Sequence, residues 1–262
     1  MINLEILTKS VCHLCEKTGD YISSESNRFQ QSDIREKGHS NFVTYVDEQA
    51  EQRLIEGLSD LLPGSGFIAE ESPELATAEF TWIIDPLDGT TNFIHGIPLI
   101  SISVALKQEN KILSGVIYEV GQREMFYTWD GASSYVNGET VRVSDTNKLI
   151  DSLFATGFPY YDYSRLDDYL DFFKFLMQHS RGIRRLGSAA ADLAYVACGR
   201  FEGFYEYGLS PWDVAAGSLL VTNAGGRICD FKGGNKYLFG KEIIATNHSI
   251  FEIFLNHFQE HF

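Results

Sequence analysis

Hydrophobic residues repeat with two different periods along the chain, and the change of period divides it into helical and strand-rich regions. Apolar residues three and four positions apart predict a long first helix over residues 3–28 and a second over Asp47–Leu62, which Pro63-Gly64 ends. The polar, glycine-bearing stretch over residues 30–41 lies between them. Short apolar runs separated by turn residues then predict a strand-rich region from Gly66 to about Val143.

The second half of the chain alternates between helices and strands. In the strand-rich region of the first half, the predicted strands are Gly66–Ala69, Thr81–Ile84, Ile100–Leu106, Ile112–Val120 and Glu124–Trp129, with a hairpin turn at Val136-Asn137-Gly138-Glu139. In the second half, the predicted strands are Leu153–Thr156, Ile183–Leu186, Phe201–Tyr207, Arg227–Asp230 and Glu242–Ala245. The predicted helices there are Leu166–Gln178, Ser188–Cys198, Pro211–Asn223 and a final helix. This order predicts an α+β or mixed α/β fold with layered helices and sheets. Without an evident linker or repeat, residues 1–262 are expected to form a single domain, with an N-terminal α+β half (1–148) and a C-terminal α/β half (149–262).

The net charge of -15 argues against DNA, RNA or an anionic membrane as a partner, because those partners need a basic surface. The longest apolar run, Ile97–Leu106, is too short to span a bilayer, and no signal-peptide pattern is seen at the N-terminus. A cytoplasmic location is therefore expected. An acidic protein that binds an anionic substrate needs concentrated positive charge at its site, and metal ions are the obvious source.

Cys12 and Cys15 form a CxxC pair but lie in a stretch with helical apolar spacing, and no second CxxC exists to complete a zinc site. We expect reduced thiols at or near the buried face of a helix.

The most informative segment is Trp82-Ile83-Ile84-Asp85-Pro86-Leu87-Asp88-Gly89-Thr90-Thr91. Pro86 disfavours a helical conformation for Asp85, which predicts an apolar strand that ends with this carboxylate at its tip. Asp88 follows one turn later, and two carboxylates on one tight turn suit hard divalent cations. Residues 89–91 can then present backbone N–H groups to a phosphate at the start of a short helix. An ordinary capped turn is the alternative, since Asp-Pro and Asp-Gly are common turn dipeptides.

Glu70 and Glu71 follow the strand Gly66–Ala69, so their side chains would meet Asp85 if the two strands are neighbours; a solvated acidic turn is the alternative reading. Asp213 lies in the first turn of a helix rich in small residues, where the helix dipole alone favours a carboxylate.

The adjacent tryptophan and the face of alanine and glycine suggest that this helix closely approaches another element. A cluster of these acidic side chains without cations would suffer strong mutual repulsion. With two or three Mg²⁺ ions, the same cluster becomes favourable and serves phosphate chemistry.

These motifs together resemble those of the inositol monophosphatase family. The matching pieces are Glu70-Glu71-Ser72, Trp82–Phe93 and Trp212–Gly217, with Gly225-Gly226 closing the last helix and a weaker match at Val43–Asp47. They occur in the family's order and spacing along nearly the whole chain. The resemblance implies a layered αβαβα sandwich of the inositol monophosphatase and fructose-1,6-bisphosphatase type. It also implies a hydrolase that is often dimeric, uses Mg²⁺ on phosphate monoesters and is commonly inhibited by Li⁺.

The resemblance further implies two to three metal sites. Glu70, Asp85 and the backbone carbonyl of Leu87 would hold the first Mg²⁺. Asp85, Asp88 and Asp213 would hold the second, and a third, weaker ion would lie near Glu70 through waters.

Thr90 and Asp47 are similar to the pair that orients and helps deprotonate the attacking water, although Asp47 can also be the N-cap of the helix 47–62. The substrate contacts implied are Asp88, Gly89, Thr90, Gly187, Ser188, Ala189, Glu206 and Asp213. Glu206 could equally be an exposed carboxylate at a strand end.

Two regions fit the resemblance less well. Lys37 and Gly38 resemble a mobile loop that closes over the site, but Asn41 stands where relatives often have Asp, which puts the loop's part in metal binding in doubt. His95 is interpreted as a packed or capping histidine rather than a general acid, since metals already supply that chemistry.

The function expected is hydrolysis of inositol 1-phosphate or a similar polyol or sugar phosphate, with this small substrate and a second copy of the chain as partners. Within the superfamily, phosphatases of 3′-phosphoadenosine 5′-phosphate, fructose 1,6-bisphosphate and histidinol phosphate are the alternatives. The continuation Thr91-Asn92-Phe93 resembles inositol monophosphatases more than the nucleotide phosphatases, which often have Lys-Glu-Phe there. An alternative of another class is a catalytically silent regulatory relative, which would be expected to have lost at least one metal ligand.

Overall fold

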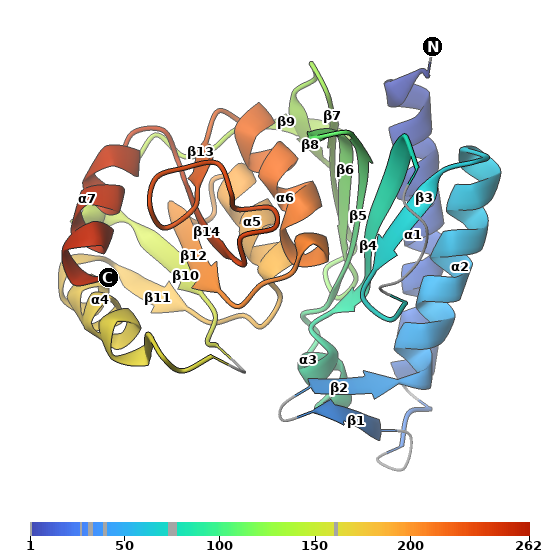
Figure 1. Cartoon of the computed structure of the whole chain (residues 1–262), viewed down its shortest axis with the longest axis horizontal. Helices are drawn as coiled ribbons and strands as arrows, with labels where there is room; N and C mark the ends of the chain where they lie inside the picture. The colour runs from blue at the N-terminus through green and yellow to red at the C-terminus, as the bar shows by residue number, and fades with distance from the viewer. Residues whose placement is uncertain (1, 27, 31–33, 39–40, 73–77, 160–161) are drawn as a thin grey trace.

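The computed structural model describes residues 2–26, 28–30, 34–38, 41–72, 78–159 and 162–262, which form five stacked layers of helices and sheets (Figure 1). Helices α1 (Leu4–Ser26) and α2 (Tyr45–Leu61) cover one face of a seven-stranded sheet, and α5 (Ala189–Ala197) and α6 (Pro211–Asn223) lie against its other face. A five-stranded sheet follows, and α4 (Leu166–His179) and α7 (Phe251–His261) form the outermost layer. The layered αβαβα sandwich is confirmed.

The two large sheets have different strand directions. The first has the order β3-β4-β5-β6-β7-β8-β9, in which β3 and β4 are parallel and the other neighbours antiparallel. The second has the order β11-β10-β12-β14-β13, with β10 parallel to β11 and β12. The strands of the first sheet are β3 (Gly66–Ala69), β4 (Phe80–Asp88), β5 (Ser101–Gln108), β6 (Lys111–Glu119), β7 (Glu124–Trp129), β8 (Ser134–Val136) and β9 (Glu139–Val141). The strands of the second are β10 (Leu153–Thr156), β11 (Gly182–Arg184), β12 (Gly203–Tyr207), β13 (Arg227–Cys229) and β14 (Glu242–Thr246).

Strand β4 is buried on both faces, which explains its nearly continuous apolar sequence. Successive side chains of a strand point to opposite faces, so Trp82 and Ile84 pack in the core beneath α1 and α2, while Ile83 packs against α5 and α6. Helices α5 and α6, between the two sheets, are rich in small residues because they pack closely against each other. A Cβ atom on Gly217 of α6 would come within 2.5 Å of the Leu193 Cβ on α5, which confirms the close approach predicted for this helix.

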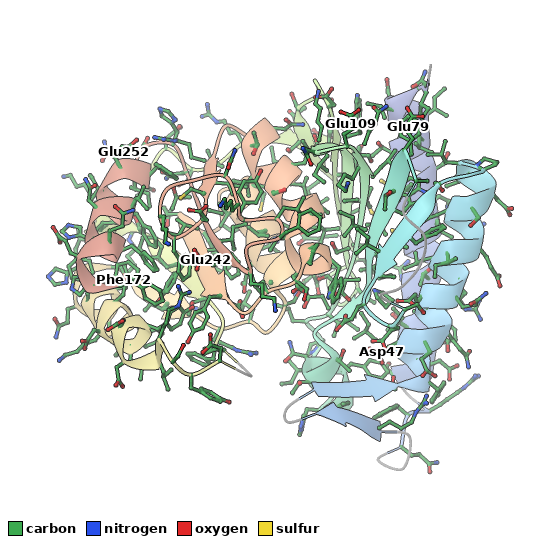
Figure 2. All side chains as sticks on the ribbon, in the orientation of Figure 1. Asp47, Glu79, Glu109, Phe172, Glu242 and Glu252 are labelled. Carbon is green, nitrogen blue, oxygen red and sulfur yellow. The ribbon has the colours of Figure 1, made fainter. Side chains whose placement is uncertain are left out.

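The outer layer is held by a cluster of aromatic rings between the five-stranded sheet, α4 and α7. Phe172 of α4 lies at its centre and makes edge-to-face contacts with Phe254 and Phe258 of α7, with ring centroids 5.2 and 4.9 Å apart (Figure 2). Such pairs add about 0.5–1.5 kcal/mol each beyond the area they bury. The described part of the chain contains no helix with the length and apolar character that a bilayer span requires.

Three local expectations change. The polar stretch over residues 30–41, for which no strand was predicted, contains β1 (Ile34–Gly38), which pairs with β2 (Asn41–Thr44) as an antiparallel ribbon. The helix predicted from Asp47 begins at Tyr45 with Thr44 as its N-cap, so Asp47 is not the cap itself. Strand β4 does not end at Asp85 but continues through Pro86 to Asp88.

Other local predictions are confirmed. Asn137 and Gly138 both have positive φ (49° and 91°), as a tight hairpin turn requires. The four cysteines are free thiols, and Cys15 is fully buried on α1.

Candidate active site and metal centre

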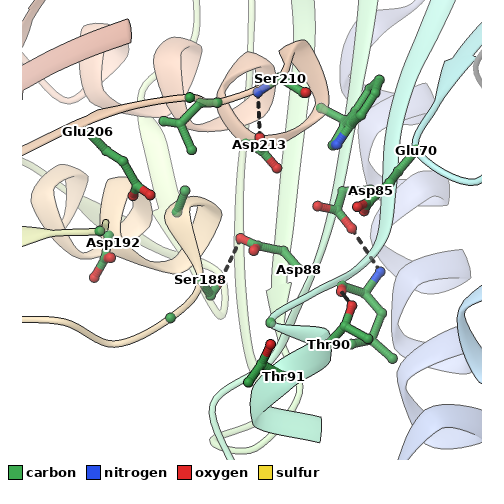
Figure 3. Close-up of a pocket in the computed structure, with 18 of the residues that line it drawn as sticks. Glu70, Asp85, Asp88, Thr90, Thr91, Ser188, Asp192, Glu206, Ser210 and Asp213 are labelled. Carbon is green, nitrogen blue, oxygen red and sulfur yellow. Dashed lines mark hydrogen bonds between the residues drawn. The ribbon is translucent and has the colours of Figure 1, made fainter. Parts of the chain in front are cut away.

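A pocket of about 220 Å³ lies where the ends of β3 and β4 meet the first turns of α5 and α6 (Figure 3). Every site residue predicted from the sequence lines it except Asp47, which contacts the pocket through Thr90. These lining residues are Glu70, Asp85, Leu87, Asp88, Gly89, Thr90, Gly187, Ser188, Ala189, Glu206 and Asp213. Residues up to 143 positions apart are thus brought to one cavity by the fold.

A bulge in β4 sets the two aspartates of the central segment. Asp85 is opposite Ser103 of β5 and Asp88 is opposite Ser101, so β4 has one residue more than its partner between these two pairs. Pro86 is tolerated in this interior strand because the bulge removes the need for its missing N–H. Asp85 Oδ1 accepts from the Leu87 N–H at 3.0 Å, which orients the carboxylate towards the pocket.

Asp88 is held by the N-terminus of α5, a helix from the other half of the chain. Its Oδ2 accepts hydrogen bonds from the Ser188 hydroxyl at 2.7 Å and from the Ala190 N–H at 2.8 Å. Ser188 is the N-cap of α5, and its hydroxyl also contacts the Ser101 hydroxyl at 2.6 Å. These bonds fix one oxygen of Asp88 and tie the two halves together at the pocket.

Gly89 follows with φ of 101° and precedes the short helix α3 (Thr90–Ile94). A Cβ at this position would come within 3.1 Å of the Leu99 carbonyl oxygen and 3.2 Å of that of Gly187. Both the positive φ and the lack of space therefore require glycine here.

Asp213 and Asp47 have the same local construction. Each is the third residue of its helix and closes a capping box, with one carboxylate oxygen accepting from the N-cap backbone N–H. For Asp213 this donor is Ser210 at 2.6 Å, and for Asp47 it is Thr44 at 2.8 Å. A capping box orients the second oxygen as well, and Asp47 Oδ1 accepts from the Thr90 hydroxyl at 3.0 Å.

Glu70 reaches the cluster because β3 is parallel to β4, with Ala69 paired to Ile84. The Glu70 N–H donates to the Ile84 carbonyl at 3.2 Å, so its side chain follows directly beside Asp85, with which it shares a hydrogen bond. Figure 3 shows the two carboxylates facing each other. Glu71, by contrast, does not line the pocket, and its N–H donates to Glu51.

Carboxylate oxygens of Asp85, Asp88 and Asp213 lie within 4.8 Å of one another. Burial is the largest cause that raises their pKa values, with the neighbouring carboxylates adding to it for Asp85 and Asp213; the pKa of Asp88 rises to about 6. The fold thus brings several carboxyl groups together in a buried place, and the charge of Arg185 opposes that of Asp88 and acts to lower its pKa. An all-oxygen donor set of this kind fits a hard divalent cation, so this group could hold a metal ion.

These pKa directions predict that the metal-free protein loses stability as pH rises. An aspartate with a raised native pKa binds more protons folded than unfolded, so for Asp88 the free energy of unfolding falls between about pH 4 and about pH 6. Denaturant unfolding with a chelator present would measure this slope. We expect it to be shallower in Asp88→Asn, whose amide oxygen can still accept from Ser188; an equal slope in both proteins would contradict the prediction.

The wall across from Asp85 and Glu70 carries Glu206, which is buried and not an exposed strand-end residue. Burial raises the pKa of its carboxyl to about 8. Space for this side chain depends on Gly157, because a Cβ there would lie 1.9 Å from Glu206 Oε1.

Two charged residues of this wall, Asp192 and Arg185, were not predicted from the sequence. Asp192 is four residues after Ser188 and thus on the same face of α5, and it is the only charged residue in an otherwise apolar helix. That isolated charge was the signal available. His95 follows α3 as its exposed C-cap residue and does not line the pocket. The side chains of Lys37 and Asn41 lie outside what the structure describes, so a loop that closes over the site stays a prediction.

The family model described as inositol monophosphatase family matches residues 3–261, and the chain belongs to this family of phosphatases. An inositol-1-monophosphatase of Mesorhizobium japonicum is 40% identical over 236 residues, covering 89% of each chain. A Nus factor SuhB of Pseudomonas aeruginosa is 39% identical over 249 residues, covering 93% of this chain and 92% of the relative.

Solved structures agree with this assignment. The extragenic suppressor protein suhB of Bartonella henselae superposes with a TM-score of 0.93 at 38% identity and covers 97% of this chain and 98% of that one. An inositol monophosphatase from Anabaena has a TM-score of 0.88 at 33% identity, with 99% and 97% covered.

Proposed function

We propose that this chain is a Mg²⁺-dependent phosphoric monoester hydrolase whose substrate is inositol 1-phosphate or a similar polyol or sugar phosphate. The observation that carries the proposal is the convergence of Asp85, Asp88 and Asp213 within 4.8 Å, beside Glu70. A structural role alone does not account for this arrangement, because buried like charges destabilise the fold unless a cation offsets them.

In the proposed site Glu70, Asp85 and the Leu87 carbonyl would hold one Mg²⁺, and Asp85, Asp88 and Asp213 would hold a second. A third would lie near Glu70. Bound Mg²⁺ would supply the positive charge that attracts the phosphate, acidifies water and stabilises the leaving oxygen.

Thr90 and Asp47 are proposed to orient the attacking water. The Thr90 hydroxyl has one proton, which can go to Asp47 Oδ1 at 3.0 Å or to the Leu87 carbonyl oxygen at 3.1 Å. Donating it to Asp47 leaves the oxygen lone pairs to accept from a water molecule. Burial raises the pKa of Asp47 above its ordinary value despite four hydrogen bonds that lower it. A more basic carboxylate is a better final acceptor for the proton that leaves the water through Thr90. The capping and catalytic tasks of Asp47 are compatible because they use different oxygens.

The phosphate and the alcohol are proposed to bind on separate parts of the pocket. Backbone N–H groups of Gly89 and Thr90 face the phosphate, where the start of α3 favours an anion. The alcohol lies towards Glu206 and the backbone of residues 187–189. The Ser188 hydroxyl is already bonded to Ser101, Asp88 and the Ala191 N–H, so its side chain serves the substrate by holding Asp88.

A regulatory function is the second candidate, because relatives at nearly the same identity carry the name Nus factor SuhB. Identity does not separate the two names, since an inositol-1-monophosphatase matches at 40% and a Nus factor at 39%. The retained acidic cluster supports catalysis, and the net charge of -15 disfavours direct contact with nucleic acid. A cytoplasmic location, a homodimer and inhibition by Li⁺ stay predictions, as does the arrangement of residues 1–262 as one domain.

Turnover of a substrate panel tests the proposal. We expect the purified protein to release phosphate from inositol 1-phosphate with added Mg²⁺ and to lose this activity after treatment with a chelator. Fructose 1,6-bisphosphate, histidinol phosphate and 3′-phosphoadenosine 5′-phosphate assayed in parallel would rank the alternatives. Asp168→Asn, which changes an exposed carboxylate on α4, is the control variant and should behave as wild type. Absence of metal-dependent release from every ester would overturn the proposed function.

A further inference from the structure

Asp192 is a buried carboxylate that the fold leaves without a complete set of partners. It is 1% exposed, and among the described residues its Oδ1 is one of two buried side-chain oxygen atoms without a hydrogen-bond partner. The other is the Tyr205 hydroxyl in the aromatic core beneath α4 and α7. Leaving a buried acceptor unsatisfied destabilises a protein, so a position of this kind needs an explanation.

The surroundings of Asp192 point to the substrate pocket. It lines this pocket together with Glu206 and Arg185. Figure 3 shows Asp192 and Glu206 on the wall opposite Asp85 and Glu70, with Asp88 between the two groups. A ligand whose phosphate is at the metal-binding group would therefore place the rest of its structure towards Asp192.

The opposite wall combines acceptors with a donor. Asp192 and Glu206 are close enough that the charge of one acts on the other, and the Arg185 guanidinium acts favourably on both. A hydroxyl group can donate to a carboxylate and accept from a guanidinium at once. An ammonium group can only donate, so it could bind the carboxylates but could not accept from Arg185. The chemistry of this wall thus favours a ligand that presents hydroxyl groups.

We propose that Asp192 is a specificity-determining residue whose Oδ1 accepts a hydrogen bond from a hydroxyl group on the alcohol part of the substrate, next to the hydroxyl bound by Glu206. The inference rests on the proposed phosphatase function and narrows it. The site selects polyol phosphates that have at least two free hydroxyl groups away from the ester. Phosphate esters of alcohols that lack these hydroxyl groups are hydrolysed without a contribution from Asp192.

Asp192→Ala tests the inference with a substitution that suits α5, a helix already rich in alanine. We expect the KM for inositol 1-phosphate to rise about 10- to 100-fold, the usual effect of losing a hydrogen bond to a charged group. The kcat for this substrate and both constants for p-nitrophenyl phosphate, whose alcohol has no free hydroxyl, should change by less than about twofold. Asp192→Asn keeps a neutral acceptor and should give an intermediate KM.

Thermal unfolding separates this role from a structural one. Because Asp192→Ala removes an unpartnered buried carboxylate, its unfolding midpoint should stay the same or rise while the KM increases. Tyr205→Phe removes the other such oxygen atom outside the pocket and should leave the KM of every substrate unchanged.

Three results would overturn the inference. The first is an unchanged KM for inositol 1-phosphate in Asp192→Ala. The second is an equal rise in the KM for p-nitrophenyl phosphate in this variant, together with a lower unfolding midpoint. The third is a wild-type preference for O-phosphoethanolamine that Asp192→Ala abolishes, which would assign the site to an ammonium group. If the wild type hydrolyses no ester, the proposed function fails; calorimetric binding of inositol 1-phosphate to wild type and Asp192→Ala then decides the inference separately, with equal affinities overturning it.

Discussion

Asp213→Asn is expected to lower kcat/KM for inositol 1-phosphate by more than about 100-fold, since changing even an outer partner of a metal ligand commonly costs 10- to 100-fold. The substitution removes the charge that Asp213 brings to Asp85 and Asp88. It does not remove the helix cap, because the amide oxygen of asparagine can still accept from the Ser210 N–H. Steady-state kinetics across a range of Mg²⁺ concentrations would measure the loss.

Thermal unfolding with and without Mg²⁺ shows whether this loss arises at the metal. Mg²⁺ should raise the unfolding midpoint of the wild type, because a ligand that binds only the folded state stabilises it. The rise should be much smaller in Asp213→Asn. Without metal, the variant should be at least as stable as the wild type, since burial, Asp88 and Glu70 all disfavour the ionised Asp213 carboxylate and raise its pKa. Near wild-type activity, or an equal response to Mg²⁺, would show that the assignment of Asp213 is wrong.

Thr90→Ala should lower kcat by about 10²- to 10⁴-fold, the range typical for loss of a group that moves a proton. Alanine removes the hydroxyl that donates to Asp47 Oδ1 and that would receive the proton of the water. The metal-binding carboxylates are unchanged, so the rise in unfolding midpoint with Mg²⁺ should match the wild type. This combination distinguishes the variant from Asp213→Asn.

Thr90→Ser is the matched control because it keeps the hydroxyl and loses only a methyl group. We expect it to retain kcat within about threefold, because the hydroxyl that donates to Asp47 is kept. If Thr90→Ala is as active as Thr90→Ser, the proposed proton path through Thr90 and Asp47 is wrong.

Most of the acidic cluster could be predicted because its parts lie in short local patterns. Asp85, Pro86 and Asp88 are within four residues, and turn chemistry alone places the two carboxylates near one another. The local prediction failed in one respect, since it ended the strand at Asp85. Pairing with β5 continues the strand to Asp88 through a bulge, and the partner strand is not visible in local sequence.

The helix caps show a similar limit. Asp47 is expected from the sequence to orient the attacking water, with a role as N-cap of the helix 47–62 as the alternative; the cap is Thr44, and Asp47 is the third helical residue. Thr44 and Asp47 are about one helical turn apart. The first residue of a helix is decided by backbone hydrogen bonds rather than by the spacing of apolar residues. The correction affects function, because the third position leaves Asp47 Oδ1 available to Thr90.

By itself, the sequence determined the layered elements, the family resemblance and the residue types of the metal centre, because periodicity and turn chemistry act over a few residues. Tertiary structure alone decided what surrounds them. Parallel pairing of β3 with β4 places Glu70 beside Asp85, and packing of the two halves brings the α5 N-terminus to Asp88. Tertiary packing also places Asp192, the charged residue of α5, at the pocket, where its Oδ1 has no hydrogen-bond partner among the described residues. Such contacts depend on how distant elements pack, and that information is spread over the whole core rather than over any one segment.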